Sequence, residues 1–176
     1  DLLCLSYYET FGMDICITRC SNNYGPYQYP EKLIPVLIKK ALNNENLPMY
    51  GDGRNIRDWI HVNDHIKAIE AVWQKGLSGE IYNIGADNPK RNIEIAKDIL
   101  SFMDIAEEKI EFVKDRPGHD WRYEVNDKKI RENLGWKPEI NFTEGIQETV
   151  KWYINNQEWW KPLMKEAGGR RGLNNE

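Results

Sequence analysis

Short apolar runs that suit β-strands alternate along this chain with segments whose apolar residues follow helical spacing. The strand-like runs cover residues 14–20, 47–50, 56–61, 80–84 and 110–113. Apolar residues at i, i+3 and i+4 predict helices over residues 33–41, 63–75, 92–103, 126–134 and 143–154. Strands that alternate with helices in this way predict an α/β fold.

Turn-forming residues separate these segments. Gly51-Asp52-Gly53 lies between two strand-like runs, which predicts that those runs pair as a hairpin. The segment SNNYGPYQYP, residues 21–30, has the Asn, Gly and Pro content of a loop. Asn63 and Asn92 stand where helices begin, and asparagine is a favoured N-cap residue.

The first helix is apolar on nearly every side. Its apolar and aromatic residues are Leu2, Leu3, Cys4, Leu5, Tyr7, Tyr8 and Phe11. Such a helix belongs inside a larger body. One interpretation is a trimmed chain with a harmless first helix, and the other is a chain that begins within a domain. The second predicts that several of these side chains are exposed, or that another copy covers them.

Composition excludes several classes of partner. The chain has 24 Lys and Arg against 28 Asp and Glu, and no basic cluster, so duplex nucleic acid is not expected as a partner. No apolar run approaches the roughly 20 residues of a membrane span. Three cysteines are too few for a disulfide scaffold, which favours the reducing cytoplasm.

No metal site or nucleophilic catalyst is expected from the sequence. His61 and His65 are four residues apart, but His61 falls on a predicted strand, so we interpret both as ordinary histidines. Cys16 and Cys20 have no second pair of ligands, which favours a role in the core. No serine stands in a nucleophile elbow.

Polar residues gather where predicted strands end and loops begin. Arg57 lies beside the 51–53 turn, and Arg116 lies in the loop Arg-Pro-Gly-His at 116–119. Asn92 stands at a helix N-terminus, where unpaired N–H groups attract anions. One guanidinium group can donate two parallel hydrogen bonds to phosphate oxygens. These residues together therefore predict a pyrophosphate site. Separate surface ion pairs are the alternative.

Several segments resemble one enzyme family. They are CSNNYGPYQYPEKLIP (20–35), GDGRNIRDWIHVNDH (51–65), EIYNIG (80–85), DRPGHDWRY (115–123) and LGWKP (134–138). They resemble the dTDP-glucose 4,6-dehydratases, which are extended short-chain dehydrogenase/reductases that act on nucleotide sugars. The patterns NNYGP and RDWxxVxD are shared with epimerases, whereas PEKLIP and DRPGHDxRY narrow the resemblance. It covers residues 1–160, and residues 161–176 are expected to form a flexible tail.

Two motifs of that family are missing. No Gly-x-x-Gly-x-x-Gly turn occurs among the 13 glycines, and none of the nine tyrosines has a lysine four positions later, so the Tyr-x-x-x-Lys motif is absent. The resemblance therefore implies the C-terminal part of an extended Rossmann-type dehydrogenase. This part would hold the last sheet strands and a small mixed α/β substrate-binding region. The NAD-binding half and the catalytic residues would be absent.

The resemblance also implies a diphosphate site. Arg57, Asn92 and Arg116 would hold the pyrophosphate, with His119 nearby. Asn22 would contact the phosphate that carries the sugar.

The remaining residues implied by the resemblance surround the nucleoside. Lys32 and Leu33 would line its pocket, and Pro48 and Tyr50 would bracket the thymine ring. Tyr153 would close the pocket.

The implied activity is that of an NAD-dependent lyase of deoxysugar biosynthesis. Bound NAD takes a hydride from C4 of the glucosyl unit, water leaves across C5–C6, and the hydride returns to C6, which gives dTDP-4-keto-6-deoxyglucose. Asn23 would face the cofactor, and the complete enzyme would be a homodimer. The alternatives are an epimerase or decarboxylase of the same superfamily and a nucleotide-binding module without catalysis.

Overall fold

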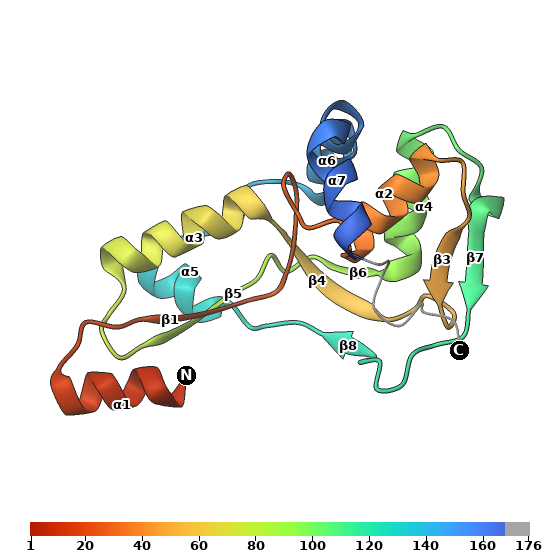
Figure 1. Cartoon of the computed structure of the whole chain (residues 1–176). Helices are drawn as coiled ribbons and strands as arrows, with labels where there is room; N and C mark the ends of the chain where they lie inside the picture. Colours follow the sequence, from red (N-terminus) through yellow and green to blue (C-terminus); the bar gives the residue numbers. More distant parts are fainter. Residues whose placement is uncertain (168–176) are drawn as a thin grey trace.

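The computed structural model describes residues 1–167 of the 176-residue chain. Within that range the chain forms helices and strands in alternation, and most of its paired strands run parallel (Figure 1). The α/β fold predicted from the sequence is therefore confirmed. The described helices include none that is long and apolar enough to cross a membrane.

A small region lies at one end of the molecule (Figure 1). Its elements are α1 (Leu2–Phe11), β1 (Ile17–Cys20), α3 (Val62–Lys75), β5 (Ile81–Ile84) and α5 (Lys128–Leu134). Strands β1 and β5 pair in parallel, with Ile17 opposite Ile81. Their core with α3 and α5 consists of Ile60, Ala68, Val72, Tyr82, Ile84, Ile130, Leu134 and Trp136.

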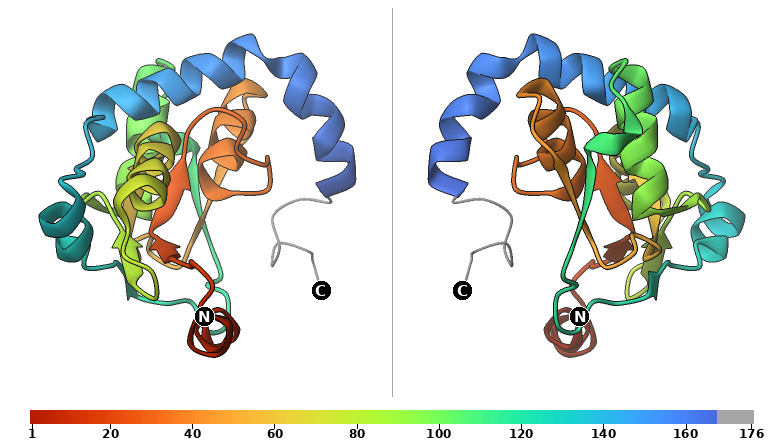
Figure 2. Two further views of the ribbon diagram at one scale, coloured as in Figure 1. Left: turned by 90° about the vertical axis from the view of Figure 1, so that its left-hand side faces the viewer. Right: turned by 90° about the vertical axis from the view of Figure 1, so that its right-hand side faces the viewer.

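A large region contains the rest of the described chain. Its strands are β2 (Asn22–Tyr24), β3 (Leu47–Tyr50), β4 (Ile56–His61), β6 (Pro89–Arg91), β7 (Ile110–Val113) and β8 (Arg122–Tyr123). Its helices are α2 (Leu33–Leu42), α4 (Asn92–Phe102), the 3-10 helix Glu107–Lys109, α6 (Phe142–Asn155) and α7 (Gln157–Ala167). Helices α2, α4 and α6 share one core, and α6 and α7 arch across the top of the molecule (Figure 2).

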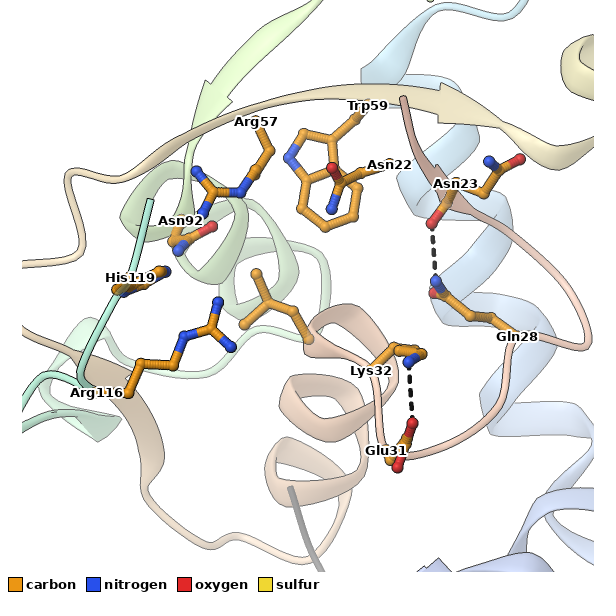
Figure 3. Close-up of a pocket in the computed structure, with 11 residues that line it drawn as sticks. Asn22, Asn23, Gln28, Glu31, Lys32, Arg57, Trp59, Asn92, Arg116 and His119 are labelled. Atoms are coloured by element: carbon orange, nitrogen blue, oxygen red, sulfur yellow. Dashed lines mark hydrogen bonds and ion pairs between the residues drawn. The ribbon is translucent and has the colours of Figure 1, made fainter. Parts of the chain in front are cut away.

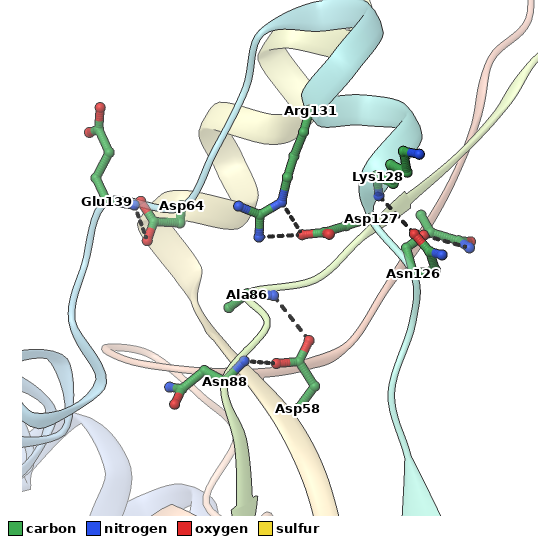
Figure 4. Close-up of polar contacts among 10 residues, drawn as sticks. Asp58, Asp64, Ala86, Asn88, Asn126, Asp127, Lys128, Arg131 and Glu139 are labelled. Atoms are coloured by element: carbon green, nitrogen blue, oxygen red, sulfur yellow. Dashed lines mark hydrogen bonds and ion pairs between the residues drawn. The ribbon is translucent and has the colours of Figure 1, made fainter.

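Strand β4 joins the two regions. Its end pairs in parallel with β2, and its start pairs with β6 and β8. Because successive side chains of a strand point to opposite faces, Trp59 packs in the large core while Ile60 packs in the small core. The Asp58 carboxylate accepts hydrogen bonds from the N–H groups of Ala86 and Asn88 at 3.0 and 2.8 Å, which anchors the segment after β5 (Figure 4).

The predicted hairpin between β3 and β4 is wrong. Strand β3 pairs in parallel with β7, which lies 60 residues later, and β4 belongs to another sheet. Gly51 and Gly53 do form a turn, with left-handed φ values of 56° and 71°. The turn leads the chain away from β3, because the Gly53 carbonyl accepts the N–H of Ile93 at 3.0 Å and so holds the start of α4.

Other local predictions need correction. The predicted loop at 21–30 contains the short strand β2, which is held by its pairing with β4. His61, rather than Asn63, caps α3, because its Nδ1 accepts the Asn63 N–H at 3.3 Å. The expected tail is helical as far as Ala167 in α7, and residues 168–176 lie outside the described residues.

Helix α1 has no buried residue. Leu2, Leu3 and Phe11 are 86%, 70% and 68% exposed. The expectation that several apolar side chains of this helix are exposed is thus confirmed.

Candidate ligand-binding site

A pocket of about 520 Å³ opens on the large region (Figure 3). It is lined by residues of β2, the loop before α2, β4, the start of α4 and the loop before β8, namely Asn22, Asn23, Gln28, Glu31, Lys32, Leu33, Arg57, Trp59, Asn92, Arg116 and His119. Its volume lies within the range of small-molecule sites. The structure therefore brings together eight of the eleven residues predicted from the sequence.

Arg57 is buried in the pocket wall and held by the backbone. Its guanidinium donates to the carbonyl oxygens of Ile56 and Asp120 at 2.7 and 2.8 Å. Asn55 Nδ2 also donates to the Asp120 carbonyl, at 3.2 Å. These bonds tie the loop that carries Arg116 and His119 to the start of β4, so the two arginines are brought to one pocket by the same contacts.

The pocket is electropositive at this end. Burial lowers the pKa of Arg57, Asp120 raises it in part, and the nearby Arg116 guanidinium lowers it further. An anion bound between the two guanidinium groups would offset both the burial and the mutual repulsion. The site is therefore suited to a phosphate or diphosphate group.

Asn92 contributes to the pocket through its side chain. The sequence predicted unpaired backbone N–H groups here, but the Asn92 N–H donates to the Asn55 carbonyl at 3.1 Å, and the Ile93 N–H donates to Gly53. The first N–H donors of α4 are thus used by the turn before β4. The Asn92 Oδ1 atom is buried and has no hydrogen-bond partner within residues 1–167.

His119 is held in place by two residues that do not line the pocket, Asp115 and Tyr50. Its Nδ1 contacts the Asp115 carboxylate at 2.7 Å, and its ring lies 6.2 Å from that of Tyr50 in an edge-on arrangement. The hydrogen bond from His119 lowers the pKa of Asp115. Pro48 and Tyr50, which were predicted in the pocket, are buried in β3 and lie outside its lining. Tyr50 contacts the lining residue His119 and not the pocket itself.

Asn23 is fixed in one orientation. Its Oδ1 contacts His65 Nδ1 at 2.7 Å, and its Nδ2 donates to Cys20 Sγ and to the Ser21 carbonyl at 3.3 and 3.2 Å. Its own carbonyl accepts Gln28 Nε2 at 2.7 Å, which links β2 to the loop before α2 (Figure 3).

Tyr153, which was predicted to close the pocket, is not among its lining residues. It is buried in α6, and its hydroxyl donates to the Gln28 carbonyl. It therefore holds the loop that lines the pocket. At the rim of the same loop, Lys32 Nζ forms an ion pair with Glu31 at 2.9 Å.

Three lining residues were missed from the sequence: Gln28, Glu31 and Trp59. Trp59 is two residues after Arg57 on β4, so strand alternation places both on one face. That spacing was a usable signal. Gln28 and Glu31 stand between Asn23 and Lys32 in a loop, where no period relates one residue to the next.

The histidine and cysteine pairs take part in core packing, helix capping and hydrogen bonding. Cys16 and Cys20 pack against the small core as free thiols. His61 caps α3 and His65 contacts Asn23. No group of three or more His, Cys, Asp or Glu residues in the described part of the chain is arranged to hold a metal ion.

Comparison with known proteins gives consistent results. A family model described as GDP-mannose 4,6 dehydratase matches residues 1–149. A dTDP-glucose 4,6-dehydratase from Streptomyces niveus is 46% identical over 174 residues, which is 98% of this chain and 52% of that protein. This chain thus spans about half the length of the curated relatives it matches.

Solved structures show the same relation. A dTDP-glucose 4,6-dehydratase from Bacillus anthracis, in complex with NAD, is 51% identical with a TM-score of 0.88, over 93% of this chain and 52% of that one. One from Streptomyces venezuelae, with NAD and TYD bound, is 44% identical with a TM-score of 0.89, over 92% and 50%. The resemblance noted in the sequence and the Rossmann-type fold class are confirmed.

Proposed function

This chain belongs to the GDP-mannose 4,6 dehydratase family, and we propose that it is the nucleotide-sugar-binding half of a dTDP-glucose 4,6-dehydratase. The observation that carries the proposal is the pocket where Arg57, Arg116 and the buried Asn92 side chain converge. Two guanidinium groups at one site match a diphosphate, because each presents paired N–H donors to phosphate oxygens. Relatives that carry this enzyme name match nearly the whole chain.

The pocket divides into two parts in this proposal. Arg57, Arg116 and Asn22 all line the pocket (Figure 3). In this proposal the two guanidinium groups hold the diphosphate, and Asn22 on β2 contacts the phosphate that bears the sugar. Lys32 and Leu33 line the nucleoside end at the start of α2.

Residues behind the lining support the nucleoside. Tyr50 on β3 lies against His119, and Pro48 is two residues earlier on the same strand, so we place the thymine on this side of the pocket. Tyr153 keeps the loop of Gln28 in place.

The Asn23 side chain has an acceptor atom available for a hydrogen bond from NAD. Its Oδ1 contacts only His65 among the hydrogen-bond partners that the described residues provide, so one of its two lone pairs is open to a donor such as a carboxamide. NAD, when bound, supplies the hydride acceptor for the redox step. The chain has no Gly-x-x-Gly-x-x-Gly turn, so the cofactor pyrophosphate would be held by the other half of the enzyme.

This chain supplies substrate affinity and orientation rather than chemistry. Binding energy from the nucleotide positions the sugar against the reacting groups, which is a major source of rate enhancement. Because the sequence contains no Tyr-x-x-x-Lys, we expect no dTDP-glucose turnover by the chain alone. We place the complete enzyme in the cytoplasm as a homodimer.

Calorimetric titration of this chain with dTDP tests the proposal. Arg57→Ala should weaken binding by about 1.5–3 kcal/mol, the range for hydrogen bonds to a charged group. Arg57→Lys should restore little, since an ammonium group lacks the planar fork. Arg54, which is 67% exposed and paired with Asp52, is the matched control, and Arg54→Ala should leave affinity unchanged.

Two outcomes contradict the proposal. Equal affinities of the Arg57→Ala and Arg54→Ala variants would mean that the diphosphate binds elsewhere. Turnover of dTDP-glucose by the chain alone would mean that it carries its own catalytic groups.

A further inference from the structure

Trp59 presents a buried hydrogen-bond donor to the pocket. The side chain is on β4, and the residue is 4% exposed. Its Nε1 has no hydrogen-bond partner in the part of the chain that the structure describes. Figure 3 shows the indole ring beside the Arg57 side chain, with its nitrogen on the side of Arg57, and the Asn22 amide overlaps the ring in this view. Register agrees with this view, because Trp59 lies opposite Asn22 in the pairing of β4 with β2.

Three residues that line the same pocket therefore carry a buried polar atom without a hydrogen-bond partner in the described residues. The other two atoms are Asn92 Oδ1, on a residue that is 5% exposed, and Gln28 Oε1. Buried polar groups are nearly always hydrogen-bonded, and an exception in a native fold calls for an explanation. The Trp59 N–H needs an acceptor, whereas the Asn92 and Gln28 oxygens need donors, so a bound ligand that carries both kinds of group provides that explanation.

The chemistry of the neighbours identifies the acceptor. An indole N–H can only donate. Arg57 uses two of its five N–H groups on the carbonyls of Ile56 and Asp120, so three remain for a ligand beside Trp59. An oxygen that accepts from a guanidinium and from an adjacent indole is typical of a phosphate, which has several lone pairs and a negative charge.

We propose that the Trp59 Nε1–H group donates a hydrogen bond to a diphosphate oxygen of the bound nucleotide, next to the oxygen held by Arg57. This inference rests on the proposed function, and it adds a donor that the sequence motifs did not indicate. Trp59 is thus a ligand-binding residue as well as a core residue.

Trp136 is a matched control. It is 7% exposed, and its Nε1 also has no hydrogen-bond partner in residues 1–167. It packs in the small core, and it is not among the residues that line the nucleotide pocket. Replacing either tryptophan by phenylalanine removes one buried N–H and part of one ring, so the two variants differ mainly in their distance from the ligand.

The test is an indole ¹⁵N–¹H spectrum of this chain during titration with dTDP. The chain has seven tryptophans, and the W59F spectrum identifies the Trp59 signal. We expect that dTDP moves this signal downfield and slows its exchange with water, whereas the Trp136 signal stays in place. Thymidine, which has no phosphate, should move neither signal. By calorimetry, W59F should bind dTDP about tenfold more weakly, and W136F should bind within about twofold of the original chain.

The outcomes separate this inference from the proposed function. If dTDP binds but the Trp59 signal and the W59F affinity do not change, the inference is wrong and the proposed function stands. If the original chain does not bind dTDP, both are wrong. Should W59F fail to fold, the signal can be assigned from its proximity to Tyr24, whose ring lies 6.5 Å away, and the titration then decides.

Discussion

Helices α1 and α2 are both ten residues long and rich in apolar side chains, yet they are buried to opposite degrees. In the large region, α2 buries Ile34, Pro35, Val36, Leu37, Ile38 and Ala41. In the small region, α1 buries none of its residues. The apolar residues of α2 face α4 and α6, whereas those of α1 point in all directions and no single partner can cover them. Burial thus follows the arrangement of apolar residues and the partners available.

The same contrast holds for the two regions as a whole. Parallel sheets normally have both faces covered. In the small region, α3 and α5 pack on the β1–β5 pair, while α3 itself exposes Ile66, Ile69 and Trp73. The large region encloses its core on its own and carries the pocket. Its stability and ligand binding should therefore depend little on side chains of α1.

A leucine-to-alanine pair tests this contrast most strongly. Leu37 is fully buried in α2, so Leu37→Ala should lower the free energy of unfolding by about 2–5 kcal/mol. Leu3 is 70% exposed in α1, and Leu3→Ala should change it by less than about 0.5 kcal/mol. Urea unfolding of both variants measures the difference. Similar losses for the two would mean that α1 is packed in solution.

Gly145 tests the packing of α6 against the pocket strands. A Cβ here would collide with the Tyr24 hydroxyl, and Tyr24 is surrounded by Trp59, His61 and Phe142. Alanine is the better helix former, but we expect Gly145→Ala to destabilise the chain by about 1–3 kcal/mol because of overpacking.

The double variant with Tyr24→Phe serves as the control for the Gly145 prediction. Removal of the hydroxyl should recover part of the loss in thermal unfolding. A more stable Gly145→Ala variant would show that α6 can move away from β2.

Local pattern explains which predictions succeeded. Helices α1 to α6 and the strand segments at 81–84 and 110–113 were predictable, because each depends on residues close in sequence, whereas α7 lies partly in the expected tail. The partner of β3 was not, since parallel pairing with β7 joins segments about 60 residues apart and a glycine turn between β3 and β4 resembles a hairpin signal.

The candidate site shows the same limit. That Arg57 and Arg116 lie in one pocket could be predicted, because Arg57 stands at the start of a strand and Arg116 in a loop. Tyr50 and Tyr153 lie behind the lining of the pocket, and sequence does not distinguish a side chain in the lining from one that supports it. Their positions depend on His119 and on the Gln28 carbonyl, which the fold alone brings to them.

The exposed face of α1 provides a third test. The triple variant Leu2→Gln, Leu3→Gln and Phe11→Gln removes apolar side chains that are 86%, 70% and 68% exposed. An apolar patch of this kind favours association. We expect self-association, measured by analytical ultracentrifugation, to weaken in the variant while dTDP affinity stays the same. A change in dTDP affinity would show that the two regions are coupled through α1.

The smallest expected effect is a pH dependence from His61. Burial lowers the pKa of this imidazole, although Glu148 and Asp64 raise it in part. As the pH falls below about 6.5, the unfolded chain takes up a proton that the folded chain resists, so stability decreases until the folded pKa is reached. Burial also lowers the pKa of His65, which acts in the same direction.

His61→Asn tests that contribution. Asparagine can still cap α3 but does not titrate in this range. The free energy of urea unfolding should therefore fall less between pH 7.5 and 5.5 in the variant than in the original chain. Equal slopes would mean that His61 is protonated alike in both states.

The alternation along β4 has a consequence for length changes in the chain. Arg57 and Trp59 face the pocket, while Asp58 and Ile60 face the segment after β5 and the small core. One inserted or deleted residue between 57 and 60 would exchange these faces and place a guanidinium among apolar side chains. Natural variants should therefore differ in length at connections outside β4, such as residues 103–109 between α4 and β7, and keep the length of β4 itself constant. Within the strand, the two faces keep their residues only when a length change involves an even number of residues.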